Sequence, residues 1–331
     1  MSLNNFKSFI YSMCTAILTG ISLAFIFILL NMSFSNPYSF DLDFNKNIDN
    51  LDNDFLNKEN EIDPTYSSHL SNSIIYSSNN NFEIKSKKSD LYPREAVRYV
   101  SAKAYMVINI SDDKVILQKN QETSLPIASI TKLVTAVVSR KLLDQDEYIV
   151  MDSDILRTYG NEGKFRLGEK IKISELLYPL LMVSSNDAGE AIASSYSLGR
   201  KKFIKEMNNW ANEIGAYRTY FSDPSGLSAR NLSTVNDISI IIKWILENDP
   251  EILNITGLKT KDLRTHTWTN PTHFLNLSAY IGGKNGYTPE ADRTGVSLFK
   301  LGKDKKIFMF IILGSSMRDN DTLDLLEEAI R

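Results

Sequence analysis

Cysteine, histidine and excess positive charge are all scarce in this chain. The 331 residues include one cysteine and three histidines, and the formal net charge is −3. A single cysteine excludes an intrachain disulfide framework and a zinc site built on several thiolates. Three histidines leave little material for a His-rich metal site. The small negative charge argues against a nucleic-acid binder that depends on a basic surface, so we expect no nucleic-acid partner.

Charge is also absent from a stretch near the N-terminus. Residues 9–30 carry no charged side chain, and a helix of about 20 apolar residues spans a bilayer. Lys7 precedes this stretch and Asp41 follows it, so the positive-inside bias predicts a single-pass cell-membrane protein with its C-terminal part on the extracytoplasmic side. The alternative, a cleaved signal peptide, has an apolar region of about 7–15 residues and a small-residue cleavage site, which we do not find here. We therefore expect residues 1–35 to be a cytoplasmic tip and a transmembrane signal-anchor helix.

Glycine is missing from the next block. Residues 36–92 are rich in Asn, Ser and Asp and contain no glycine. Such a segment buries too little apolar area to offset the entropy lost on ordering. We predict a flexible stalk over residues 36–92 and one folded domain over residues 93–331.

The folded block has strand patterns at both ends and helical patterns between them. A hairpin is expected at 102–109 and 115–118, and further strands at 295–301 and 307–313. Helices are expected at 128–143, from 174 onward, and at 187–195, 200–214, 237–247 and 321–331. The order predicts an α+β domain, in which an antiparallel sheet formed by both domain termini carries flanking helices and a helical lobe.

Three short segments carry the chemistry, and the first contains Ser129 and Lys132. At the start of a helix, residues three apart share a face, so the hydroxyl and the amine converge. A neutral amine can take the serine proton and produce a nucleophile, provided that the lysine is desolvated or lies near another cation. The same spacing at Ser111 falls in a predicted turn, and at Ser297 it falls in a predicted strand, so only Ser129 has the helical context.

The other two segments are polar or glycine-rich. The segment Ser184-Ser185-Asn186 separates two apolar helical patterns. Its hydroxyl could relay a proton and its amide could bind a substrate carbonyl. The alternative interpretation is a simple helix–helix turn. Residues 283–288 flank Lys284 with glycines, which favours close backbone approach to an anionic ligand, although an Asn-Gly strand turn is the alternative.

In this order the three segments resemble the Ser-x-x-Lys, Ser-x-Asn and Lys-Thr-Gly elements of the penicillin-binding and serine β-lactamase superfamily. The chain is most similar to the serine-type D-Ala-D-Ala carboxypeptidases, the low-molecular-mass penicillin-binding proteins. The connecting sequence resembles theirs too, at residues 125–132, 184–188, 221–227 and 231–234. The resemblance implies a β-lactamase/transpeptidase-like fold, penicillin binding, and removal of the terminal D-alanine from peptidoglycan stem peptides.

The resemblance also assigns catalytic roles. It makes Ser129 the nucleophile of an acyl-enzyme and Lys132 its general base. Ser184 relays the proton toward the leaving amine, and Asn186 positions the substrate backbone and Lys132. It implies no cofactor and no metal, with β-lactam antibiotics as covalent inhibitors.

The same resemblance makes residues 284–287 the substrate-binding segment. Lys284 attracts the terminal carboxylate, Asn285 and Gly286 follow it, and the backbone N–H of Tyr287 joins that of Ser129 in an oxyanion hole. Two residues depart from the family. Asn285 stands where Thr or Ser is usual, but its amide can still donate to a carboxylate, and Asp292 stands where glycine is usual.

Three alternatives remain open. A DD-endopeptidase that cuts crosslinks uses the same constellation. A β-lactamase needs a deacylating glutamate three residues before a Leu-Asn pair, whereas the chain has Pro250 three residues before Leu253. The third alternative is an inactive, membrane-tethered module that only binds muropeptides.

Overall fold

The computed structural model describes residues 100–330. The predicted anchor (1–35), the predicted stalk (36–92) and the boundary between stalk and domain lie outside the described residues. Within residues 100–330, no helix is both long and apolar enough to cross a membrane.

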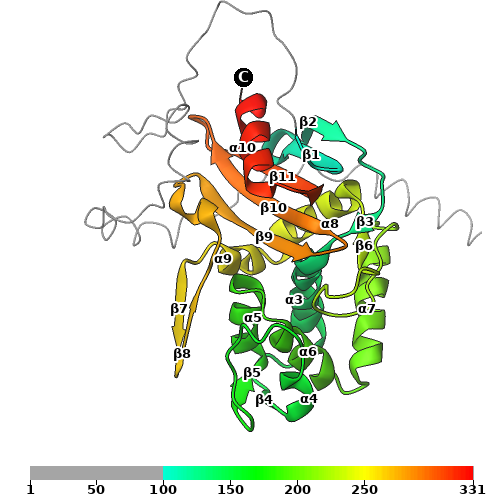
Figure 1. The fold of residues 1–331 in the computed structure, drawn as a ribbon, viewed down its shortest axis with the longest axis vertical. Coiled ribbons are helices and arrows are strands. Elements are labelled where there is room, and N and C mark those ends of the chain that lie inside the picture. The colour runs from blue at the N-terminus through cyan, green and yellow to red at the C-terminus, as the bar shows by residue number, and fades with distance from the viewer. Residues whose placement is uncertain (1–99, 331) are drawn as a thin grey trace, which may run out of the picture. The chain divides into compact units, whose positions relative to one another are not determined.

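A five-stranded antiparallel sheet lies in the upper half of the domain as drawn in Figure 1, above a group of helices. Its order is β2-β1-β11-β10-β9. The strands are β1 (Ala104–Asn109), β2 (Lys114–Lys119), β9 (Tyr280–Thr288), β10 (Asp292–Leu301) and β11 (Lys306–Ser315). Because β1 pairs with β11, the sheet joins the two ends of the domain, which confirms the predicted α+β arrangement.

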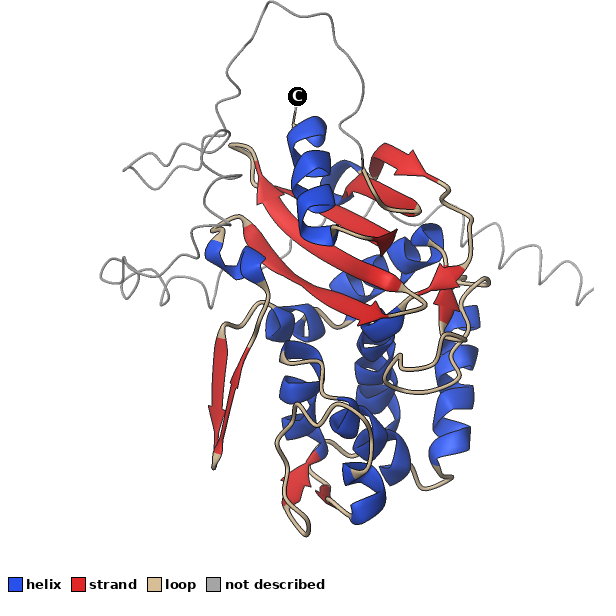
Figure 2. Cartoon of the chain, viewed as in Figure 1, coloured by secondary structure: helices blue, strands red, loops and turns tan. Residues whose placement is uncertain are grey.

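Three two-stranded ribbons accompany the sheet, and helices make up most of the rest (Figure 2). The ribbons are β3 (Leu125–Pro126) with β6 (Leu232–Ser233), β4 (Tyr148–Val150) with β5 (Lys170–Lys172), and β7 (Thr260–Leu263) with β8 (His266–Thr269). The α-helices are α3 (Thr131–Leu142), α4 (Ser153–Leu156), α5 (Ile173–Met182), α6 (Asn186–Ser195), α7 (Arg200–Glu213), α8 (Val235–Asn248), α9 (Glu251–Thr256) and α10 (Arg318–Ala329). The short 3-10 turns are η3 (Ile110–Asp112), η4 (Ala128–Ile130) and η5 (His273–Asn276).

The central strands are buried on both faces. Along β11, Met309 and Ile311 join the core that contains α8, whereas Phe310 and Ile312 join a second core that contains α10. Successive side chains of a strand point to opposite faces, so both sides of the sheet are covered by helices. The sheet is therefore packed on both faces, and β9 is one of its edge strands.

Local signals set the helix ends near the site. The Ser185 side chain accepts a hydrogen bond from the Ala188 N–H and caps α6, and the Thr234 side chain caps α8 in the same way. The helix expected from residue 128 begins in a different form, because Ser129 lies in the 3-10 turn η4 and α3 begins at Thr131. The closing helix begins at Arg318, three residues earlier than expected.

Candidate active site

Ser129 and Lys132 meet at the junction of η4 and α3. Lys132 Nζ lies 2.9 Å from Ser129 Oγ. Lys132 is fully buried, while Ser129 is half-buried and so remains open to a ligand. The two residues are brought together by one turn of helix, as their spacing predicts.

Two further acceptors hold the Lys132 amine. Its Nζ donates to Asn186 Oδ1 at 2.7 Å and to the Ser225 carbonyl at 2.5 Å. A neutral amine has two N–H bonds and one lone pair. If the two N–H bonds stay on Asn186 and Ser225, the lone pair faces the Ser129 hydroxyl. The geometry therefore suits an amine that accepts a proton from serine.

Burial lowers the pKa of Lys132 well below its usual range, and the charge of Lys284 lowers it further. Asp223, Asp187 and Glu190 act in the opposite direction. Burial disfavours the charged form of a lysine, and a nearby cation adds to that effect. Both influences increase the fraction of Lys132 that is neutral and able to act as a base.

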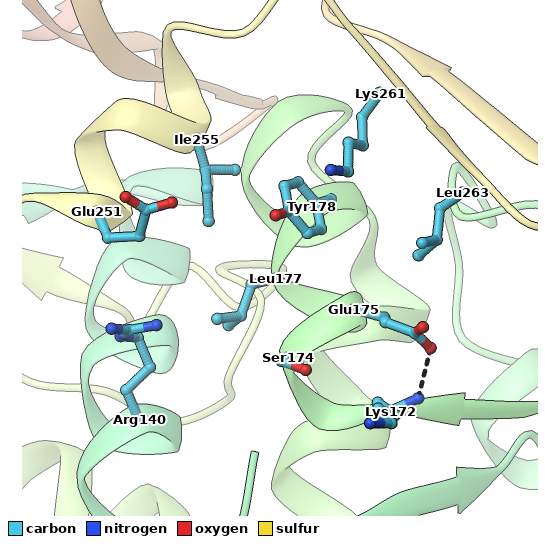
Figure 3. A pocket seen from close by; sticks show the side chains of 10 residues that line it. All are labelled: Arg140, Lys172, Ser174, Glu175, Leu177, Tyr178, Glu251, Ile255, Lys261 and Leu263. Carbon is cyan, nitrogen blue, oxygen red and sulfur yellow. Dashed lines mark hydrogen bonds between the residues drawn. The ribbon is translucent and has the colours of Figure 1, made fainter. Parts of the chain in front are cut away.

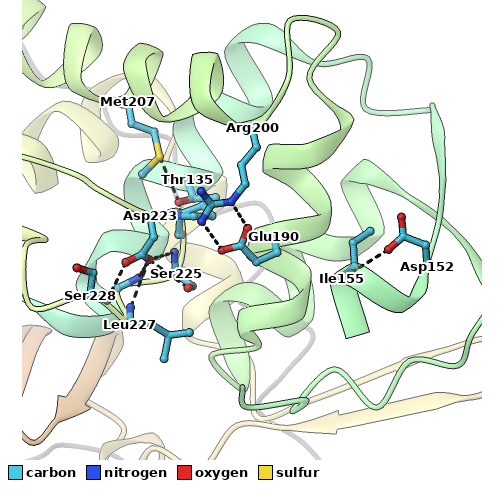
Figure 4. Close-up of polar contacts among 12 residues, drawn as sticks. Thr135, Asp152, Ile155, Glu190, Arg200, Met207, Asp223, Ser225, Leu227 and Ser228 are labelled. Carbon is cyan, nitrogen blue, oxygen red and sulfur yellow. Dashed lines mark hydrogen bonds and ion pairs between the residues drawn. The ribbon is translucent and has the colours of Figure 1, made fainter. Parts of the chain in front are cut away.

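A loop at residues 221–231 fixes the Ser225 carbonyl. The buried Asp223 carboxylate accepts backbone N–H groups of Ser225 at 2.8 Å, Gly226 at 2.6 Å and Ser228 at 2.8 Å (Figure 4). The pattern collects the loop backbone around one carboxylate. Lys132 thus gains a fixed acceptor from a segment about ninety residues away.

The same loop packs directly on η4. Gly226 has a φ of +86°, and a Cβ at this position would lie 1.9 Å from the Ala128 carbonyl oxygen. The Asn231 amide donates to Thr131 Oγ1 at 3.0 Å. Glycine is required at residue 226 because both the positive φ and the close approach exclude a side chain.

Ser184 and Lys284 form a second polar pair. Lys284 Nζ donates to Ser184 Oγ at 3.0 Å and to the Asn285 carbonyl at 2.9 Å. Lys284 is buried, and burial followed by the charge of Arg318 lowers its pKa to about 7. Ser184 has a φ of +60°, an uncommon conformation for a residue other than glycine.

The edge strand β9 passes close to Ser129. A Cβ on Gly286 would lie 2.7 Å from the Ser129 backbone nitrogen, so the strand backbone and the serine backbone nearly touch. Asn285 directs its amide toward Thr272 Oγ1 at 3.5 Å, and the Tyr287 side chain is largely exposed. Because β9 ends the sheet, its outer side is free of a pairing strand among the described residues and can accept an extended peptide.

The structure brings most of the predicted site residues together and adds three. Ser129, Lys132 and Asn186 are joined by hydrogen bonds, as are Ser184 and Lys284. Asp292, the second departure from the family, has a φ of +53°, which aspartate tolerates better than most residues. The additions are the Ser225 carbonyl, Asp223 and Arg318. The sequence singles out residues 221–227 only by their resemblance to the family, and it contains no signal for Arg318.

A separate hollow of about 340 Å³ lies between α5, α9 and β7 (Figure 3). Several of its charged groups are already paired, for example Arg140 with Asp249 at 2.5 Å and Lys172 with Asp146 at 2.8 Å. Lys261 lies over the Tyr178 ring, 4.3 Å from its centroid. Across residues 100–330, we find no cluster of His, Cys, Asp and Glu able to hold a metal ion. The hollow lacks the nucleophile and base that Ser129 and Lys132 provide.

Known proteins are similar to this chain in sequence and in fold. The chain is 33% identical over 178 residues to a D-alanyl-D-alanine endopeptidase of Escherichia coli, covering 53% of this chain and 56% of that protein. It is 30% identical over 229 residues to the D-alanyl-D-alanine carboxypeptidase DacF of Bacillus subtilis, covering 65% of this chain and 58% of that protein. The chain thus spans less than two thirds of the length of these curated relatives.

Solved structures and a family model indicate the same group of proteins as the curated relatives. Penicillin-binding protein D2 from Listeria monocytogenes, in its cefotaxime-bound form, is 25% identical with a TM-score of 0.64, covering 72% of this chain and 100% of that one. A D-alanyl-D-alanine carboxypeptidase from Mycobacterium tuberculosis has the same fold, with 24% identity and a TM-score of 0.65 over 71% of this chain and 93% of that one. The family model described as D-alanyl-D-alanine carboxypeptidase matches residues 92–312, well over half of the chain. The chain therefore belongs to the D-alanyl-D-alanine carboxypeptidase family.

Proposed function

We propose that the chain is a serine DD-carboxypeptidase that removes the terminal D-alanine from peptidoglycan stem peptides. The observation that carries the proposal is the buried Lys132 amine, held by Asn186 and Ser225 with Ser129 Oγ at 2.9 Å. This geometry supports an activated serine nucleophile. The family membership and the name of the Bacillus subtilis relative support the substrate class.

Acylation follows from the groups at the site. Neutral Lys132 takes the proton of Ser129, and Oγ attacks the carbonyl of the penultimate D-alanine. The oxyanion is stabilised by the backbone N–H groups of Ser129 and Tyr287, and loss of one such donor typically slows a reaction by about 10²–10³. The C–N bond then breaks, Ser184 passes a proton to the leaving amine, and D-alanine departs. Water next attacks the ester and regenerates Ser129.

Substrate recognition rests on β9 and two cations. An extended stem peptide lies along the free edge of β9, with its terminal carboxylate near Lys284 and Arg318. Arg318 lies close enough to Lys284 for its charge to lower the pKa of that lysine. An uncharged terminus would therefore be recognised less well than a terminal carboxylate. The cefotaxime-bound Listeria homologue supports β-lactams as covalent inhibitors that use the same serine.

Product analysis tests the reaction. The purified protein is incubated with a monomeric pentapeptide and, separately, with a crosslinked peptide dimer. Free D-alanine from the pentapeptide is the expected result. Cleavage of the dimer alone would instead establish the DD-endopeptidase, the second candidate, which is favoured by the 33% identity to the Escherichia coli endopeptidase. Absence of either product, together with no fluorescent-penicillin label, would overturn the proposal in favour of a non-catalytic binding module.

The nucleophile has its own control. Ser129→Ala removes the attacking oxygen and is expected to abolish penicillin labelling. Ser111→Ala is the matched control, because Ser111 has the same Ser-x-x-Lys spacing but lies in the 3-10 turn η3 between β1 and β2. Labelling of Ser129→Ala at the parent level would show that another residue is acylated.

We propose a membrane attachment from the sequence alone. Residues 1–35 would anchor the chain, residues 36–92 would act as the stalk, and residues 93–331 would lie on the extracytoplasmic side. The support is the absence of charge over residues 9–30. Protease added to intact spheroplasts is expected to cleave the stalk and release the domain. Retention of the full chain until lysis would contradict this topology.

A further inference from the structure

A loop at residues 157–169 links the proposed base to a distant hairpin. The Asn186 side chain donates from Nδ2 to the Tyr159 carbonyl at 2.7 Å, and the Asn186 backbone N–H donates to the Gly160 carbonyl at 3.4 Å. A Cβ on Gly160 would lie 2.6 Å from Asn186 Nδ2. The loop backbone is therefore pressed against the amide that contacts Lys132.

This contact determines which end of the Asn186 amide faces the lysine. Oδ1 accepts from Lys132 Nζ at 2.7 Å, while Nδ2 donates to Tyr159. A flipped amide would place its NH₂ group against the Lys132 amine and its oxygen against the Tyr159 carbonyl, so both contacts would become repulsive. The position of the Tyr159 carbonyl thus sets the acceptor that orients Lys132.

The hairpin β7–β8 holds the other part of this loop. The Trp268 indole, which is fully buried, donates from Nε1 to the Gly163 carbonyl at 3.1 Å. His266 Nε2 lies 2.6 Å from Glu169 Oε1, and the His266 ring stacks on Trp268 with centroids 5.1 Å apart. Phe165 from the loop packs edge-on against both rings. The loop is therefore fastened to β8 at Gly163, Phe165 and Glu169.

We propose that Trp268 and His266 are positioning residues for the acylation step. They fix the loop at residues 157–169, the loop fixes the Asn186 amide, and the amide orients Lys132 toward Ser129. This inference rests on the proposed function, since it concerns the rate at which Ser129 is acylated. Neither residue contacts Ser129 or Lys132, so their effect passes through Asn186.

Two tryptophan substitutions test the proposal in the full-length protein. Trp268→Phe keeps an aromatic ring but removes the N–H that holds Gly163. Trp210→Phe is the matched control, because Trp210 is equally buried and its Nε1 has no hydrogen-bond partner within the described residues. The measurement is the acylation by fluorescent penicillin, resolved into a limiting rate constant and a non-covalent dissociation constant.

Loss of one neutral hydrogen bond predicts a fall of about 5- to 10-fold in the limiting rate constant for Trp268→Phe. The dissociation constant is expected to stay within about twofold, because the residue touches no substrate group. Trp210→Phe is expected to match the parent. Equal rates for Trp268→Phe and Trp210→Phe would overturn the inference while leaving the proposed function intact, since the parent would still be labelled.

A double-mutant cycle shows whether the effect passes through Asn186. In an Asn186→Ala background, adding Trp268→Phe is expected to change the remaining rate by less than about twofold, because the link has already been cut. A full 5- to 10-fold loss in both backgrounds would show that Trp268 acts by another route. Should Trp268→Phe fail to fold, His266→Leu serves in the same cycle, since it removes the contact with Glu169.

Discussion

Lys284 acts electrostatically on Lys132: after burial, the charge of Lys284 is the largest influence that lowers the pKa of Lys132. Arg318 acts in turn on Lys284, whose pKa falls to about 7. The charge of Arg318 thus lowers the pKa of Lys284, and the charge of Lys284 lowers the pKa of Lys132. Removing the charge of Arg318 should therefore change the pKa of Lys284, and removing the charge of Lys284 should change the pKa of Lys132.

The first prediction concerns pH and Lys284. Deprotonation makes Lys132 a base, so kcat/KM should rise as the pH passes through the lowered pKa of Lys132. Above about pH 7, Lys284 loses the charge that we propose attracts the substrate carboxylate, so kcat/KM should fall. In Lys284→Arg the falling limb should move to higher pH, because arginine stays protonated.

The check is the pH profile of D-alanine release for the parent and Lys284→Arg. Lys243→Arg is a suitable control, because Lys243 lies on α8 and pairs with Asp113, away from the site. Identical falling limbs in the parent and Lys284→Arg would remove Lys284 as the titrating group.

The second prediction concerns Arg318, which the sequence did not single out. Arg318→Gln removes a positive charge that lowers the pKa of Lys284, so this pKa should rise and the falling limb should shift to higher pH. Loss of one cation near the carboxylate should also raise KM by about 5- to 10-fold. Arg140→Gln, at the far end of α3, is the comparison. A falling limb that shifts to lower pH would contradict the electrostatic link.

The third prediction concerns Gly226 and stability. Gly226→Ala places a Cβ 1.9 Å from the Ala128 carbonyl, whereas Gly199→Ala, at a similar φ of +84°, meets nothing within 4 Å. Both substitutions strain the backbone by about 1–3 kcal/mol, and only Gly226→Ala also displaces η4. We expect Gly226→Ala to lower the free energy of unfolding by at least about 2 kcal/mol more than Gly199→Ala, and to slow labelling of Ser129.

Chemical denaturation monitored by tryptophan fluorescence measures the difference. Equal losses of stability in the two variants would show that η4 moves aside without penalty. Normal labelling of Gly226→Ala would show that the position of Ser129 does not depend on this contact.

The fourth prediction concerns Asn285, which stands where the family usually has Thr or Ser. Within residues 100–330, the Asn285 side chain makes one hydrogen bond, from Nδ2 to Thr272 Oγ1, and this bond is long at 3.5 Å. Both amides and hydroxyls donate to carboxylates, so Asn285→Thr should keep kcat/KM within about threefold. Thr272→Val, which removes the long contact, should behave likewise. Complete inactivity of Asn285→Thr would reveal a specific role for the amide.

Much of the fold follows from local pattern. The helix expected at 200–214 is α7 at Arg200–Glu213, and the strand expected at 307–313 lies within β11. Amphipathic spacing and a terminal glycine define such elements without reference to the rest of the chain. Their ends shift by a few residues where a cap or a sheet partner extends them.

The edge strand β9 shows where local pattern fails. Its Gly-Gly-Lys-Asn-Gly run has a low strand propensity and suggests a turn, yet it forms one continuous strand. The reason is tertiary. A Cβ on Gly283 would lie 2.0 Å from the Val296 carbonyl oxygen, and Gly286 presses against Ser129, so close packing requires glycine inside the strand.

In the active site, too, local sequence pattern predicts some residues, and only the tertiary fold reveals the others. Ser129 and Lys132 stand out because helix geometry alone brings residues three apart together. The Ser225 carbonyl is a backbone group, and any residue could supply it, so no side-chain motif reveals it. Arg318 influences Lys284 because α10 packs against the sheet that contains Lys284. This proximity depends on the tertiary fold and cannot be predicted from the spacing of the two residues in the sequence.

The pairing of β1 with β11 has a consequence for how the protein is made. Ala104 pairs with Leu313, so the first strand waits for a partner that is synthesised about two hundred residues later. The hydrophobic faces of β1 and the η4–α3 segment remain without their sheet until β9, β10 and β11 have emerged. Contacts this distant in sequence slow folding. A nascent chain that ends before β9 contains Ser129 and Lys132 but lacks Lys284 and the strands that pack around the site. The proposed activity therefore requires that β9, β10 and β11 have been synthesised.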